Sequence, residues 1–181
     1  MISITASQFT VYRQQVDRTD RLTVNPKDSG RMAEWRTVAG TIAEGYRVAS
    51  GLTDSSPYPE GTLAMQLPYF LERGFDLRPY FLGTLNVAIA PHQYRLINPT
   101  ITLEQVPWTA AHAPETFSFA HCRLTWQDHT EAGWIYYPHP ETKPMHFQKP
   151  DRVEVLMPKI TGIQYGDRVQ LAVLTDEVHI D

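Results

Sequence analysis

The chain has 181 residues, enough for one domain with a sizeable core and too few for two ordinary ones. Hydrophobic residues make up 42% of the sequence and charged residues 20%, as in soluble globular proteins, and the formal net charge is −4. This negative balance, without a long run of Lys or Arg, argues against nucleic acid or an anionic membrane as the main partner, because neutralising phosphate groups requires clustered positive charge.

The cysteine content and the hydropathy pattern indicate the cellular compartment in which the protein is expected. Cys122 is the only cysteine, so an intrachain disulfide and a cysteine-based zinc site are both excluded. Residues 1–5 lack the basic and apolar regions of a signal peptide. No apolar run approaches the ~20 residues that a membrane-spanning helix needs. We therefore expect a cytoplasmic protein that does not bind a membrane; the residues do not reveal its oligomeric state.

Residues 1–36 are rich in charged side chains and contain a loop-forming stretch at 25–30. We interpret them as an N-terminal extension. In the simpler interpretation they pack on the domain through Val11, Tyr12 and Val16. The folded domain is expected to span residues 37–181.

Within this domain the pattern predicts many short strands and one principal helix. Residues 37–43 form the first expected strand, and Gly40 allows close backbone approach there. Residues 46–60 carry turn-forming residues, and Pro68 and Gly74 bracket a short helix. Alternating segments at 116–126, 132–137, 153–157 and 168–174 are expected to be strands. Short strands with Pro- and Gly-rich turns are typical of a closed, mainly all-β barrel.

The stretch Gly83-Thr84-Leu85-Asn86-Val87 is the most informative motif, because it opens an apolar run. Side chains two apart on a strand point to one side, so the oxygens of Thr84 and Asn86 should converge while Leu85 and Val87 face a core. Two neutral oxygens suit Mg²⁺, which fills its shell with water and phosphate. A strand that merely exposes Thr and Asn has the same pattern, and spacing alone favours that interpretation.

Two further motifs flank this stretch. A Glu-Gly pair at 60–61 leads to Leu67-Pro68-Tyr69, and Val153–Pro158 is followed by Gly166-Asp167-Arg168-Val169. In this order the three motifs resemble the CTP-dependent riboflavin kinases of the archaeal type, with their E-G…L-P-x-Y run, GTLN motif and closing L-E-I-I-A-P…G-D-x-V pattern. The resemblance covers about residues 37–173.

This resemblance implies a single cradle-loop, riboflavin-kinase-like β-barrel with one principal short helix. It also implies Mg²⁺-dependent phosphoryl transfer from a nucleoside triphosphate, CTP in the family, to riboflavin, which gives FMN. The matching positions make Thr84 and Asn86 the metal ligands. Glu154 matches a flavin-contacting carboxylate, which could orient the ribityl hydroxyl or accept its proton as the catalytic group. Thr142 is the nearest match to the family's flavin-contacting threonine, although its spacing differs.

The nucleotide side departs most from the family. A short glycine loop of the family corresponds here to a region that begins at Glu44-Gly45 and ends at Glu60, Gly61 and Thr62, with a long insertion between. We expect its two halves to meet in space. Lys159, Ile160 and Thr161 match the family's nucleotide-contacting stretch, but the arginine of that stretch is missing, and lysine binds phosphate with less geometric specificity.

Two other interpretations stay open at this stage. The chain could keep the barrel and bind a flavin, nucleotide or other small ligand without catalysis, since fold and function separate easily. It could also be an interaction module with the N-terminal extension as its contact. The seven histidines form no metal-binding motif, and His139 and His146, which bracket a Pro-rich loop, are more typical of surface residues.

Overall fold

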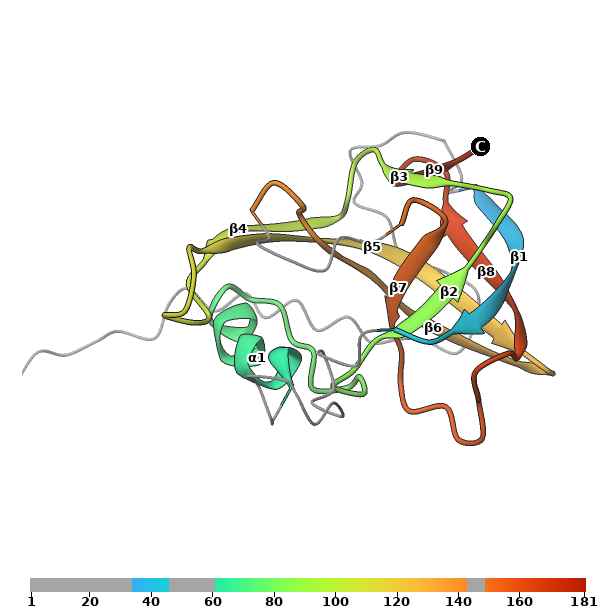
Figure 1. The fold of residues 1–181 in the computed structure, drawn as a ribbon, viewed down its shortest axis with the longest axis horizontal. Helices are drawn as coiled ribbons and strands as arrows, with labels where there is room; N and C mark the ends of the chain where they lie inside the picture. Colours follow the sequence, from blue (N-terminus) through green and yellow to red (C-terminus); the bar gives the residue numbers. More distant parts are fainter. Residues whose placement is uncertain (1–33, 46–60, 143–148) are drawn as a thin grey trace, which may run out of the picture. The chain divides into compact units, whose positions relative to one another are not determined.

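Nine strands and one helix are formed by the residues that the computed structural model describes, which are 34–45, 61–142 and 149–181. The described residues belong to one compact unit, Ala33–Asp181. Its elements, in chain order (Figure 1), are β1 (Trp35–Ala43), α1 (Thr62–Glu72), β2 (Leu85–Ala88), β3 (Tyr94–Leu96), β4 (Ile101–Val106), β5 (Glu115–Trp126), β6 (His129–Pro138), β7 (Arg152–Leu156), β8 (Arg168–Leu174) and β9 (Val178–Ile180). The protein is therefore mainly β, as the sequence predicts.

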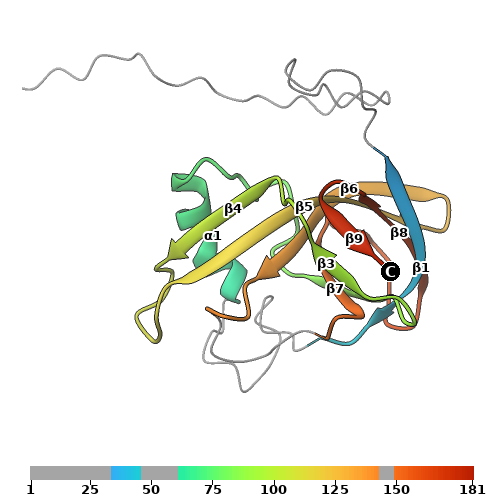
Figure 2. The ribbon, with the colours of Figure 1, turned by 90° about the horizontal axis from the view of Figure 1, so that it is seen from above.

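Six of the strands close into a ring. Their order is β5–β6–β7–β2–β1–β8, and β8 pairs again with β5, so every neighbouring pair in the ring is antiparallel. β5 closes the ring with its second half, where Cys122–Thr125 lie opposite Gln170–Val173. Its first half pairs instead with β4. This sharing of one long strand extends the sheet beyond the ring (Figure 2).

The interior of the ring holds one apolar core. Alternate residues of the ring strands point inward, and Ile89, directly after β2, joins them; these side chains are all buried: Ile42, Val87, Ile89, Ala120, Cys122, Leu124, Ile135, Val153, Val155, Leu171 and Val173. Gly40 permits close approach here, because a Cβ at this position would lie 2.5 Å from Cγ1 of Val87. Leu85 also packs against this core, as expected from the strand pattern.

A second apolar core lies on the outer face, between the extended sheet and α1. Leu63 and Phe70 of α1 are fully buried against Phe117 and Phe119 of β5, and Phe70 meets both rings edge-on at 5.2 and 5.5 Å between centroids. Helix α1 thus covers the outward side chains of β5, while Ala120, Cys122 and Leu124 face the inner core, which accounts for the buried residues on both faces of this strand. Figure 1 shows α1 alongside β4 and β5.

The prediction that Pro68 starts the helix is wrong. The helix begins six residues earlier, after Gly61, and Pro68 lies inside it. Leu63, Gln66 and Phe70 recur at helical spacing and are buried, so packing on the sheet stabilises the earlier turns. Pro68 is on the exposed side, where water can replace the backbone hydrogen bond that proline removes. Gly74, with φ of 85°, follows the end of the helix as expected.

Both ends of the ring are covered. At one end β3 and β9 pair with each other and send Tyr94, Leu96, Val178 and Ile180 onto the inner core. At the other end, the loop between β7 and β8 packs Ile160 and Ile163 against it. In the part of the chain that the structure describes, no helix is long and apolar enough to cross a membrane.

Candidate functional site

The predicted motifs meet on the outer face where β2 lies between β1 and β7. Asn86 is opposite Ala43 of β1 and opposite Glu154 of β7. Because Leu85 and Val87 face the inner core, as do Val153 and Val155, the side chains of Asn86 and Glu154 project together from the other face of the sheet. The register of three strands therefore brings two predicted site residues side by side.

Asn86 and Glu154 are both buried, each with 7% exposure. This differs from the simple expectation that polar side chains on this face are exposed. Oδ1 of Asn86 is buried and has no hydrogen-bond partner among the described residues. A buried oxygen without a partner costs free energy of about 1–3 kcal/mol, so it marks a place where a ligand can supply the missing contact.

Gly45 creates the space that Asn86 occupies. A Cβ at this position would lie 2.2 Å from Nδ2 of Asn86, so only glycine allows the amide to pack here. The resemblance implies that Gly45 belongs to a nucleotide loop. The structure places its backbone directly against a predicted metal ligand.

Arg152 also belongs to this face, and the sequence motifs did not identify it. It lies two residues before Glu154 and opposite Ala88, and its Nη1 donates a hydrogen bond to the Glu44 carbonyl at 2.7 Å. Its Nε is buried without a hydrogen-bond partner in the described part of the chain. The sequence could have pointed to Arg152, because it lies two residues before Glu154 on one strand, and alternation places both side chains on one face.

The remaining motif residues are distributed around the same end of these strands. Thr84 is half-buried and directly precedes β2, and the preceding segment is held by a hydrogen bond from the Phe81 N–H to the Met157 carbonyl at 2.9 Å. Lys159, Ile160 and Thr161 follow β7 at this end; Lys159 and Thr161 are exposed, and Ile160 packs on the inner core. The convergence of the Thr84 and Asn86 oxygens stays a prediction.

Gly61 and Thr62 lie at the start of α1. Gly61 is buried with φ of 84°, and Thr62 is the first helical residue. The first turn of α1 has no acidic residue and no side-chain cap. The N–H groups of such a turn form a positive end that suits an anion. Glu60 lies outside the described residues.

Thr142 lies apart from this group, in the segment after β6. Its hydroxyl donates to the His139 carbonyl at 3.0 Å and accepts from the Thr116 N–H at 2.9 Å. Both bonds hold the turn after β6 onto the start of β5. The structure therefore gives Thr142 a local structural contact, and its predicted flavin contact stays untested.

The charge of Glu154 acts on its surroundings. Burial and, secondarily, the Glu154 charge raise the pKa of Tyr136, whose hydroxyl donates to Oε1 of Gln66 at 3.0 Å. The same two causes raise the pKa of Tyr94. Both phenols are therefore neutral hydrogen-bonding groups at ordinary pH.

The donor set fits a cation that takes few protein ligands. Asn86 offers a buried unpartnered oxygen next to the Glu154 carboxylate, and Thr84 precedes it on the same segment. Among the described residues, no cluster of three or more His, Cys, Asp or Glu could hold a metal ion. Oxygen ligands in small number are the preference of Mg²⁺, which keeps several waters or phosphate oxygens.

Comparisons with known proteins do not assign the chain to a family. No family model matches the sequence. No curated protein matches it significantly.

Proposed function

We propose that the chain is a divergent member of the CTP-dependent riboflavin kinase type, with a cradle-loop barrel fold, that transfers the terminal phosphoryl group of a nucleoside triphosphate to riboflavin. The observation that carries the proposal is the buried Oδ1 of Asn86, which has no hydrogen-bond partner among the described residues and lies beside Glu154, where two motifs of the resemblance meet. The closed strand ring is compatible with this fold. The expected donor is CTP, the expected metal is Mg²⁺ and the expected compartment is the cytoplasm.

Each group has a role that its position supports. Asn86 and Thr84 would hold Mg²⁺, whose charge neutralises the transferred phosphoryl group. Glu154 is positioned to orient the ribityl hydroxyl or to accept its proton. Arg152 supplies a guanidinium on the same face, and it could serve in place of the arginine missing beside Lys159. The N–H groups at the start of α1, next to Gly61, would contact phosphate oxygens.

A second candidate is a protein that binds a flavin, nucleotide or other small ligand on the same ring without catalysis. The observation that favours it concerns Thr142, the nearest match to the family's flavin-contacting threonine. Its hydroxyl already makes two local hydrogen bonds, so it is not free to make the flavin contact. The insertion at residues 46–59 also favours this candidate, because it interrupts the family's nucleotide loop.

The test is conversion of riboflavin to FMN with CTP and then ATP as donor, with and without Mg²⁺. The kinase proposal requires FMN formation that depends on Mg²⁺ and that is lost in Asn86→Ala and strongly reduced in Glu154→Gln. The exposed Glu104→Gln change serves as a control. If the unmodified protein forms no FMN with either donor but is stabilised by riboflavin or a nucleotide, the binding function replaces the kinase. If it binds neither, both proposals fail.

A further inference from the structure

A cavity of about 570 Å³ lies beside the start of β7, on walls different from those of the Asn86 site. One wall comes from β3 and the residues after it, and the other from β4, β5 and the end of β6. Asn86, Glu154 and Gly45 are not among its lining residues. This volume is ordinary for a site that encloses a small organic molecule.

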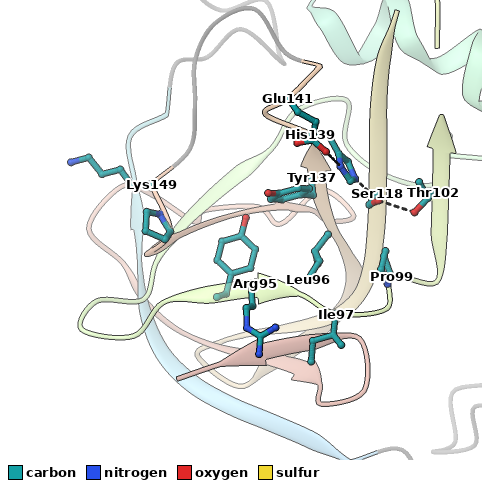
Figure 3. A pocket seen from close by; sticks show the side chains of 12 residues that line it. Arg95, Leu96, Ile97, Pro99, Thr102, Ser118, Tyr137, His139, Glu141 and Lys149 are labelled. Carbon is teal, nitrogen blue, oxygen red and sulfur yellow. Dashed lines mark hydrogen bonds and ion pairs between the residues drawn. The ribbon is translucent and has the colours of Figure 1, made fainter. Parts of the chain in front are cut away.

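Four side chains form a continuous hydrogen-bonded chain along this cavity (Figure 3). Oγ1 of Thr102 lies 2.8 Å from Oγ of Ser118, and this oxygen lies 2.8 Å from Nε2 of His139. Nδ1 of the same imidazole lies 2.8 Å from Oε1 of Glu141. The residues come from β4, β5 and the segment after β6, so the fold assembles the chain from three parts of the sequence.

The four hydrogen-bonded side chains contain a Ser-His-Glu series like that of a hydrolase, but they cannot act as a hydrolase centre. Ser118 has no exposed surface, because Thr102 and His139 cover its hydroxyl on two sides. A nucleophile must approach a carbonyl carbon to about 3 Å, which this burial prevents. The hydrogen-bonded chain has two exposed ends, Thr102 and Glu141, and both line the cavity; Thr102 is the end that presents a neutral hydroxyl to it.

The direction of every hydrogen bond in the chain follows from its acidic end. The pKa of Glu141 is lowered, because its own backbone N–H and the His139 side chain donate hydrogen bonds to it. An ionised carboxylate only accepts, so Nδ1 of His139 carries the proton, and in the neutral imidazole Nε2 accepts from Ser118. Ser118 has then used its proton, so Thr102 must donate to it. The Thr102 oxygen is left with lone pairs, an acceptor on the cavity wall.

The other lining residues indicate two further properties of the ligand, a flat ring and a negative charge. Tyr94 and Tyr137 supply aromatic surface, with their ring centroids 6.4 Å apart at an angle of 90°. Arg95 and Lys149 also belong to the lining, and both carry positive charge. Aromatic rings stack on flat heterocycles, and the positive charges of lysine and arginine attract a phosphate.

We propose that this cavity is a second small-molecule site, which binds a flat heterocycle with a ring N–H that donates to Oγ1 of Thr102 and with an attached phosphate. The hydrogen-bonded chain fixes Thr102 as an acceptor and so selects a ring with an N–H over one with an N-methyl group. Uridine monophosphate and FMN share this chemistry, since each joins an imide N–H to a phosphate. The site is independent of the phosphoryl-transfer site.

Titration calorimetry at about pH 8, where an imidazole is ordinarily neutral, tests the proposal with uridine monophosphate, FMN and their N3-methyl analogues. Thr102→Val and Ser118→Ala should each weaken binding of the N–H compound by ~3–10-fold, the value of one hydrogen bond. They should leave binding of the N-methyl analogue unchanged. Thr125→Val is the matched control, because Oγ1 of Thr125 makes the same kind of bond, 2.8 Å to Oγ1 of Thr130, away from the cavity.

The outcomes separate this site from the kinase proposal. Binding of either ligand that responds to Thr102→Val but not to Asn86→Ala supports the cavity whatever the kinase assay gives, and the responding ligand identifies the source of the imide. Amide NMR shifts at Thr102 and Tyr137 upon titration should accompany it. The proposal is overturned if neither ligand binds more tightly than ~1 mM, if Thr102→Val has no effect, or if the N-methyl analogues bind equally well.

Discussion

Asn86 on β2 and Glu154 on β7 lie directly opposite each other, and each side chain is 7% exposed. Cross-strand neighbours on one face are close enough to act on one ligand. Burying the amide oxygen of Asn86, which has no hydrogen-bond partner among the described residues, is costly unless the oxygen serves binding, because burial removes its contact with water. The pair therefore links the register of the strand ring directly to the proposed site.

Asn86→Ala should leave stability almost unchanged, within ~1 kcal/mol, because the lost Oδ1 has no hydrogen-bond partner in the described part of the chain. Leu171→Ala, in the inner core with no exposed surface, should cost ~2–5 kcal/mol. Urea denaturation measures both changes. Stabilisation of the unmodified protein by CTP with Mg²⁺ should disappear in Asn86→Ala. A large loss of stability in that variant would instead show a structural role for the amide.

Gly45→Ala should displace the Asn86 side chain, because the new Cβ would lie 2.2 Å from Nδ2. We expect a loss of stability of ~1–3 kcal/mol from overpacking, together with weaker stabilisation by CTP and Mg²⁺ in thermal-shift measurements. Gly74→Ala is the control, because a Cβ there meets nothing within 4 Å and only the φ of 85° opposes it. Equal ligand-induced shifts in both variants would separate Gly45 from the site.

The sequence predicts the individual strands of the ring but not the strand pairing that closes it. Alternation in residues 116–126 predicts the two faces of β5, and the structure places Ala120, Cys122 and Leu124 inward and Phe117 and Phe119 outward. The pairing of Cys122–Thr125 with β8 depends on contacts between segments distant in sequence, which local pattern does not encode. The early start of α1 was missed for the same reason, since packing on the outer core outweighs the Pro68 signal.

Strand alternation predicts the direction of the side chains in the candidate site, but the sequence does not predict which of them are buried. The i, i+2 rule places Asn86 away from Leu85 and Val87, but it does not reveal that Gly45 and Glu154 bury the amide. His139 was interpreted as a surface residue of a Pro-rich loop. Its contact with Ser118 follows from the register of β5 and β6, in which Ser118 lies opposite Tyr137, two residues before His139. Only the register brings the histidine to that serine.

Cys122 should be unreactive toward alkylating reagents in the native protein. Its side chain is buried, and burial followed by the Glu177 charge raises the pKa of the thiol, so the reactive thiolate is scarce. The expected result is no labelling by iodoacetamide under native conditions and complete labelling in urea, followed by mass spectrometry. Labelling at a rate that tracks urea-induced unfolding would confirm that Cys122 reports opening of the ring. Rapid labelling of the native protein would contradict its position in the inner core.

Glu177→Gln should destabilise the protein by ~1–3 kcal/mol at neutral pH, with an effect that depends on pH. Glu177 is 7% exposed, and its carboxylate accepts hydrogen bonds from Oγ1 of Thr100 and from the backbone N–H of His121, each at 2.7 Å. Burial alone would raise its pKa, but these bonds and the His121 side chain outweigh burial and lower the pKa below its ordinary value of 4.5.

The sign of the pH dependence follows from that lowered pKa. Between the folded and the unfolded pKa the unfolded chain binds the proton and the folded protein does not, so the contribution of Glu177 is complete above 4.5 and is lost as pH falls through the folded pKa. The difference in unfolding free energy between the unmodified protein and Glu177→Gln should thus be largest near pH 7 and should shrink below 4.5. Urea denaturation across this range measures it, with the exposed Glu104→Gln as the matched control. A difference that grows as the solution becomes more acidic would contradict the assigned contacts of Glu177, because it would require a raised pKa in the folded protein.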